Sequence, residues 1–83
     1  MTNGAAASFV FEGTLDVESF RAFARRRAAR LSLDLAFGEA SAQAVTAHVR
    51  GPAALIDAFE MACSLGPIDC LVREVRRLGE GDG

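Results

Sequence analysis

One arginine, Arg21, directly follows a short loop between an apolar run and an amphipathic segment. The run Phe9-Val10-Phe11 is typical of a strand, and the segment from Phe20 to Leu31 is typical of a helix. Loop amides and the positive end of a helix dipole concentrate positive potential at one point, and an arginine beside them can bind an oxyanion. This stretch therefore has the arrangement of an anion-binding site.

The side chains inside this loop oppose that chemistry. The candidate anion-binding residues are Asp16, Val17, Glu18, Ser19 and Phe20. A phosphate cradle favours glycine, because glycine reaches positive φ and lets the backbone approach the ligand closely. Two of these positions carry carboxylates instead, and like charges about 4 Å apart near a protein surface repel by about 4 kcal/mol. The sequence therefore predicts an impaired anion site.

The first strand and helix must position this loop. We expect a strand over 8–12 with Phe9 and Phe11 facing the core, preceded by frayed residues 1–7. We expect a helix over 17–31, capped by Asp16, because apolar residues recur at helical spacing. Its other arginines are interpreted as a solvated face that suits the C-terminal dipole rather than a nucleic-acid patch. These arginines are Arg25, Arg26, Arg27 and Arg30.

The second half of the chain contains the remaining elements. Alternating apolar residues predict strands over 33–38 and 45–50, joined by a turn over 39–43. Gly51-Pro52 begins a second helix, and Gly66-Pro67 ends the connection that follows it. A last strand over 68–75 is followed by a polar tail from Arg76 onward.

The resulting order, β-α-β-β-α-β, with right-handed crossovers predicts a ferredoxin-like α/β (α+β) sandwich. It has a four-stranded antiparallel sheet with both helices on one face. We expect one domain over 1–83, with a core of about 8–77.

Several motifs of residues 8–75 resemble the acylphosphatase family in order and spacing. Gly13 and Phe20-Arg21 match the glycine that ends the first strand and the Phe-Arg at the helix start. The later positions of the pattern are matched by Gly51, Ile56, Phe59, Gly66-Pro67, Cys70, Val72 and Val75. The resemblance implies metal-free hydrolysis of the carboxyl-phosphate bond of small acyl phosphates.

The family's functional residues carry over only in part. The resemblance implies that loop amides and an arginine hold phosphate, while an asparagine at the end of the second strand positions water. Arg21 matches the arginine, but Glu39 stands at the asparagine position and Asp16-Val17-Glu18 replaces Gln-Gly-Val. The Asp-Gly of the family's next turn is Ala42-Gln43 here. The candidate catalytic residues are therefore Arg21 and Glu39.

Two hypotheses follow from this departure. The leading one is a degenerate acylphosphatase-like domain with little or no acyl-phosphate hydrolysis and a binding or regulatory role, its protein partner unidentified. In it, Arg21 pairs with Glu39, or else with Asp16 or Glu18. The alternative is an active acylphosphatase that binds a small acyl phosphate or phosphate through its loop amides, with the Asp16 and Glu18 side chains pointing outward.

A third class, the RNA-binding module, shares the order of elements but needs aromatic side chains on the open sheet face to stack on bases. The residues expected on that face include no aromatic. They are Val10, Glu12, Thr46, His48 and Arg50. We therefore expect no nucleic-acid partner, and the net charge of −2 gives no general attraction to nucleic acid or to a membrane surface.

Composition sets the remaining expectations. No apolar run is long enough to span a membrane and the N-terminus does not resemble a signal peptide, so a cytoplasmic location is expected. His48 is the single histidine, so we expect no metal site, and no cofactor is implied. We expect His48 to be an exposed strand residue without a neighbouring nucleophile. Cys63 and Cys70 are interpreted as small buried side chains, with the helix C-terminal dipole raising the pKa of Cys63.

Overall fold

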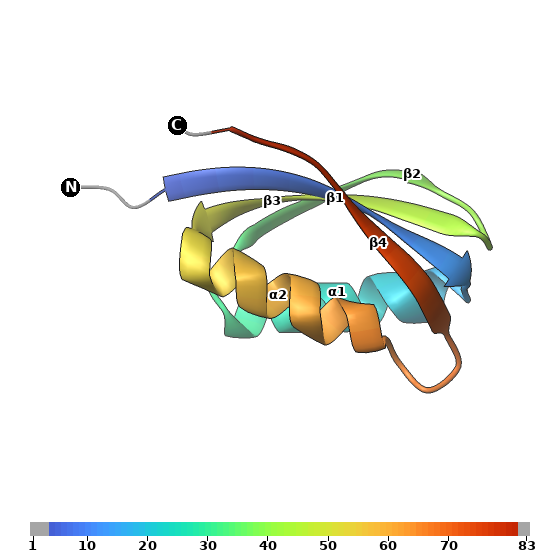
Figure 1. Ribbon diagram of the computed structural model, residues 1–83. Coiled ribbons are helices and arrows are strands. Elements are labelled where there is room, and N and C mark those ends of the chain that lie inside the picture. Colours follow the sequence, from blue (N-terminus) through green and yellow to red (C-terminus); the bar gives the residue numbers. More distant parts are fainter. Residues whose placement is uncertain (1–3, 82–83) are drawn as a thin grey trace.

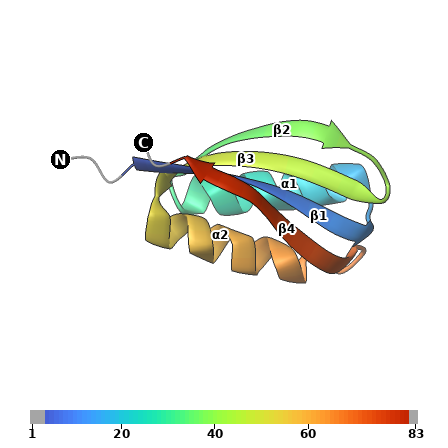
Figure 2. The same cartoon turned by 45° about the horizontal axis from the view of Figure 1, so that its top comes forward.

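The computed structural model describes residues 4–81, which form six elements in the order β-α-β-β-α-β. The elements are β1 (Gly4–Thr14), α1 (Val17–Arg30), β2 (Asp34–Ala40), β3 (Ala44–Pro52), α2 (Ala53–Leu65) and β4 (Leu71–Gly81). All neighbouring strands are antiparallel, in the order β2-β3-β1-β4. Both helices cover one face of the sheet (Figure 1), and the other face is open (Figure 2). The expected ferredoxin-like α/β sandwich is confirmed.

The core lies between the sheet and the two helices. Phe9 and Phe11 of the central strand β1 are fully buried and face the helices, as the alternation predicted. The Phe11 ring centroid lies 5.2 Å from that of Phe20 in α1 and 6.5 Å from that of Phe59 in α2. These aromatic contacts hold both helices against one strand, and so fix where the loop between β1 and α1 lies.

Strand β1 is longer than predicted. It begins at Gly4, and Ala6 and Ala7 pair with Arg50 and Val49 of β3. The prediction that residues 4–7 fray was therefore wrong, while residues 1–3 lie outside the described residues. Small residues have weak strand propensity, but pairing with strands on both sides outweighs it here.

Strand β4 begins later and ends later than predicted. Ile68 is fully exposed in the loop, and the strand starts at Leu71. Arg76 and Arg77 pair with Val10 and Phe9 of β1, so the prediction of a polar tail was wrong for 76–81. Residues 82–83 lie outside the described residues. The long β1 offers backbone hydrogen-bonding groups to β4 as far as Gly81. The charged side chains of β4, an edge strand, do not prevent this pairing with β1.

Strand β2 continues to Ala40, so Glu39 lies in the strand and not in the turn. The register contains one extra residue: Phe37 opposes Ala47, and Ala40 opposes Val45. Three steps along β2 therefore match two steps along β3, which is a β-bulge. Such a bulge changes the face of the sheet to which the following side chains point.

No helix in residues 4–81 is long and apolar enough to cross a membrane.

Candidate functional site

The loop before α1 forms an ordinary helix N-cap. Asp16 is extended, and its Oδ1 accepts a hydrogen bond of 3.0 Å from the Ser19 amide, as the sequence predicted. The Leu15 amide donates to the Ala42 carbonyl at 2.7 Å, and the Phe20 amide donates to the Asp16 carbonyl at 2.9 Å. A carboxylate of the chain thus lies at the helix N-terminus, where an anionic ligand would otherwise interact with the dipole.

The loop before β4 makes further contacts with these residues. The Ser19 hydroxyl donates to Asp69 Oδ1 at 2.7 Å, and the Asp16 amide donates to the Cys70 sulfur at 3.4 Å. Sequence reasoning missed Asp69. The only available signal was an acidic residue just after Gly66-Pro67, where the two loops meet at the same end of the sheet. The described residues supply no acceptor for the amides of Val17 and Glu18, the two positions in the loop that stay unpaired.

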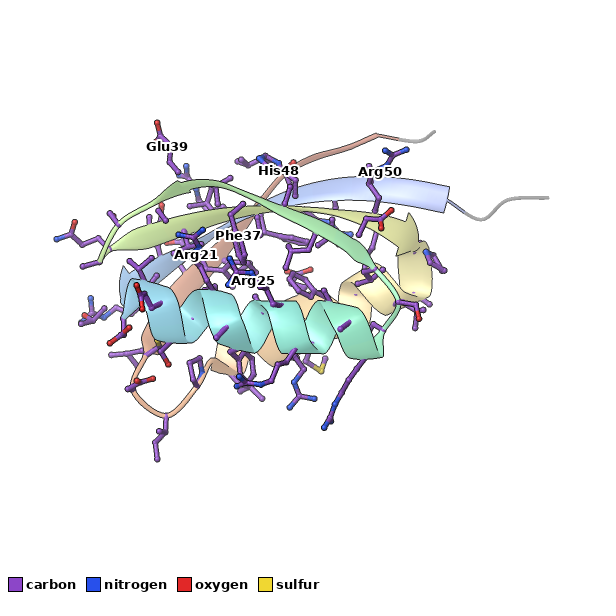
Figure 3. All side chains as sticks on the ribbon, turned by 180° about the vertical axis from the view of Figure 1, so that it is seen from behind. Arg21, Arg25, Phe37, Glu39, His48 and Arg50 are labelled. Carbon is purple, nitrogen blue, oxygen red and sulfur yellow. The ribbon has the colours of Figure 1, made fainter. Side chains whose placement is uncertain are left out.

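Arg21 turns away from this loop towards β2. Its guanidinium carbon lies 5.1 Å from the centroid of the Phe37 ring, and that of Arg25 lies 5.4 Å from the same ring (Figure 3). The Nε of Arg21 is buried, and no described residue accepts a hydrogen bond from it. The groove that both arginines line is formed by α1 and β2 and contains none of the loop residues 15–20. Arg21 therefore lines this groove and not the loop that caps α1.

Glu39 lies on the opposite face of the sheet from Arg21. It is exposed and lines a depression with Val10 and Thr46, residues of the open face. Figure 3 shows Glu39 pointing away from the helices, whereas Arg21 lies between α1 and the sheet. The β-bulge explains this orientation, since the register that precedes it would set residue 39 opposite the buried Val45.

The predicted pairing of Arg21 with one of its own carboxylates is not found. Among the described residues, no Asp or Glu oxygen lies within ion-pair distance of Arg21; the ion pairs involve Arg76 and Arg77 instead. Glu39 is on the other face, Asp16 caps α1, and Glu18 is exposed in the first turn of α1.

The structure also revises the interpretation of the arginine face. Arg26 and Arg30 are exposed as expected. Arg25 is exposed as well, but its guanidinium group also lies over Phe37. Arg27 is half-buried and lies over Phe23, with 5.3 Å between the guanidinium carbon and the ring centroid. The sequence did contain a signal for the contact of Arg25 with Phe37. Arg25 is four residues after Arg21, so both side chains lie on the same side of α1, which faces Phe37.

His48 is an exposed strand residue, as predicted, but it has a neighbour that the sequence did not suggest. Its Nδ1 lies 2.8 Å from the Ser8 hydroxyl oxygen, because Ser8 and His48 are directly opposed on β1 and β3. No carboxylate among the described residues bonds this imidazole. The pair lies on the open sheet face.

The two cysteines differ. Cys63 is fully buried, and burial raises the pKa of its thiol to about 12, opposed by the nearby charge of Arg27. The predicted direction was right, but burial rather than the helix dipole is the main cause. Cys70 is only partly buried, contrary to expectation, and burial together with the charges of Asp69 and Asp16 raises its pKa. Within residues 4–81, no cluster of three or more His, Cys, Asp or Glu side chains could hold a metal ion.

The arrangement of sheet and helices is the ferredoxin-like fold of acylphosphatases. The structure is similar to that of an acylphosphatase from Coxiella burnetii, with a TM-score of 0.83 and 21% identity over 92% of this chain and 80% of that one. It is similar to the acylphosphatase from Bacillus subtilis, with a TM-score of 0.83 and 18% identity over 93% of this chain and 84% of that one.

A larger protein contains the same fold. Full-length HypF, in a phosphate- and nucleotide-bound form, matches all of this chain with 11% of its own length, at a TM-score of 0.84 and 19% identity. No family model and no curated protein matches this sequence. At these identities the likeness establishes the fold, and function must be argued from the site.

Proposed function

We propose that this chain is an acylphosphatase-like domain that hydrolyses acyl phosphates little or not at all and acts as a binding module. The observation that carries the proposal is the separation of the three parts that the chemistry needs. Arg21 lines the groove between α1 and β2, Glu39 lies on the open sheet face, and the loop amides meet neither of them.

The electrostatics of the loop support the same conclusion. A phosphate approaching the start of α1 meets the carboxylates of Asp16 and Asp69, which already accept hydrogen bonds from Ser19. Like charges at about 4 Å repel by about 4 kcal/mol near a protein surface. Loss of one preorganised donor to the transition state typically costs about 10²–10³ in rate, and here neither Arg21 nor Glu39 lies at the loop amides.

An active acylphosphatase is the second candidate, and two observations favour it. No carboxylate of the described residues neutralises Arg21, and the amides of Val17 and Glu18 have no acceptor among them. A rotation of the Arg21 side chain towards the loop would bring these groups together. This candidate requires the Asp16 carboxylate to leave the Ser19 amide at the same time.

Hydrolysis of benzoyl phosphate by the purified chain tests the proposal. The wild-type protein, Arg21→Ala and the exposed-site control Arg26→Ala are compared, with the Bacillus subtilis acylphosphatase as a positive control for the assay. We expect all three forms of this chain to hydrolyse benzoyl phosphate no faster than buffer. Turnover by the wild type and Arg26→Ala that disappears in Arg21→Ala would establish the active enzyme instead.

A further inference from the structure

A groove of about 510 Å³ between α1 and β2 carries positive charge that the protein does not neutralise. Arg21 and Arg25 line it from the helix, and both guanidinium groups lie over the Phe37 ring (Figure 3). Asp34 lines the same groove but forms no ion pair with either arginine. Two arginines one helical turn apart repel each other, so an anion between them would remove an unfavourable interaction.

The wall of this groove is a strand edge. β2 is the last strand of the sheet and pairs only with β3. Its central residues, Leu35-Ala36-Phe37-Gly38, carry no charge, whereas the opposite edge strand β4 carries charged residues at 73, 74, 76 and 77. Charged side chains are a common means of preventing pairing at an exposed edge. β2 lacks this protection in its centre, so its outward backbone groups are available to another extended chain.

The spacing of the two arginines matches that of an added strand. Residues four apart on a helix are separated by about 6 Å along its axis. Residues two apart on a strand are separated by about 6.6 Å and point to the same face. An extended segment paired with β2 would therefore present alternate side chains to α1 at nearly the separation of Arg21 and Arg25. Guanidinium groups bind carboxylates in a planar, two-bonded geometry.

We propose that β2 and the Arg21–Arg25 pair bind an extended acidic peptide segment of a partner protein by strand addition. Two carboxylates, two residues apart, face the two arginines, while the peptide backbone pairs with the outer edge of β2. This inference rests on the proposed binding role and names its partner. A second copy of this chain fits less well, because the acidic residues of its own β2, Asp34 and Glu39, are five positions apart.

The test uses the whole chain and a defined probe, acetyl-Thr-Val-Glu-Val-Glu-Val-Thr-amide. Backbone amide shifts of the ¹⁵N-labelled protein are followed while the peptide is added. A control peptide of the same composition, Thr-Val-Glu-Glu-Val-Val-Thr, points its two carboxylates to opposite faces. A second control replaces both glutamates by glutamine. We expect saturable shifts in β2 and the Arg21–Arg25 turn with the first peptide only.

Protein variants separate the charge from the fold. Arg25→Gln should lower the affinity for the peptide about fivefold, which is the effect of losing one exposed ion pair. The matched control Arg26→Gln, on the exposed side of α1, should leave the affinity unchanged. N-methylation of alternate peptide amides should abolish binding for one set and spare the other, because only one set pairs with β2.

Each contrary result has a defined meaning. Equal binding of all three peptides, shifts outside β2 and α1, or no shifts at millimolar peptide would overturn the proposal. Inorganic phosphate that reproduces the Arg21–Arg25 shifts and displaces the peptide without shifts along β2 would indicate an anion site without strand addition. A dimer that Arg25→Gln dissociates in the absence of peptide would assign the edge to a second copy. Benzoyl phosphate turnover would refute the non-hydrolytic role independently, since that assay contains no peptide.

Discussion

Arg77 and Arg21 lie over phenylalanine rings in different parts of the molecule, with the same distance of 5.1 Å between guanidinium carbon and ring centroid. Arg77 of β4 covers Phe9 and also bonds Asp57 at 3.3 Å and Glu60 at 3.4 Å in α2. Arg21 covers Phe37 and has no carboxylate partner among residues 4–81.

This difference shows that an arginine–aromatic contact does not by itself reveal a role. The charge of Arg77 is neutralised within the fold, so the contact ties β4 to α2. The charge of Arg21, reinforced by Arg25, is not neutralised by any carboxylate of residues 4–81. We call these the Arg77 cluster (Phe9, Asp57, Glu60, Arg77) and the Arg21 cluster (Arg21, Arg25, Phe37).

The largest expected difference between the two clusters is the loss of stability on truncating the phenylalanine of each. Phe9 is fully buried against Phe11 and Phe59, so Phe9→Ala should lower the free energy of unfolding by about 3–5 kcal/mol. Phe37 is only half-buried, and Phe37→Ala should cost about 1–2 kcal/mol. Urea unfolding followed by circular dichroism measures both. Equal losses would mean that the Arg21 cluster is as much a part of the core as the Arg77 cluster.

The two cysteines differ in burial, and this difference should make the stability of the protein depend on pH through Cys63. The folded-state pKa of Cys63 is about 12, above the ordinary 9.0, so above pH 9 the unfolded chain loses this proton while the folded chain keeps it. Stability should therefore fall as pH rises from 9 towards 12, by up to about 1.4 kcal/mol per unit. The chain has no Lys or Tyr to titrate in this window.

Unfolding in urea at pH 8, 9, 10 and 11 measures this slope, with two variants for comparison. Cys63→Ala should flatten the slope, whereas Cys70→Ala should retain most of it. The thiol of Cys70 should also react with a disulfide reagent in the folded protein, since it is partly exposed near the loop, while Cys63 should react only on unfolding. A slope that persists in Cys63→Ala would contradict this assignment.

The smallest expected difference lies in the arginines themselves. Arg77→Met removes the positive charge that pairs with Asp57 and Glu60. It should lower the free energy of unfolding by about 1 kcal/mol, because these pairs are partly exposed to solvent. Arg25→Met removes a charge that repels Arg21 and should change stability by less than about 0.5 kcal/mol. Melting temperatures at low and high salt separate the two, because Arg77→Met loses an attraction and Arg25→Met loses a repulsion, so salt should change the two effects with opposite sign. A large loss in Arg25→Met would assign a structural role to the Arg21 cluster.

The sequence contained enough to predict the fold. Alternation in Phe9 and Phe11, the helical spacing around Phe20 and the Gly66-Pro67 boundary each follow from local rules, and the structure agrees with them. Gly51 and Pro52 instead end β3, and the second helix begins after them at Ala53. The strand ends were missed because pairing with a long neighbour decides them. Ala6 and Arg76 have little strand signal of their own, yet both pair with a partner strand.

The candidate site was less predictable for a physical reason. The resemblance to acylphosphatases placed Arg21 and Glu39 in one site, but a single extra residue in β2 set Glu39 on the opposite face. No local rule marks that bulge, because Gly38 and Glu39 could equally have begun the turn. The contact between Ser19 and Asp69 joins residues 50 positions apart, and it depends on how the two loops pack.

The extra residue in β2 also bears on how this chain can diverge. A codon change at position 39 exchanges the side chain but keeps the register, so Glu39→Asn would put its amide on the open face of the sheet. Moving that position to the helical face requires the bulge to be lost, so that residue 39 opposes Val45 and the turn takes up the residue that the bulge now holds. An asparagine facing Arg21 is therefore separated from this sequence by a change in strand register as well as in residue identity.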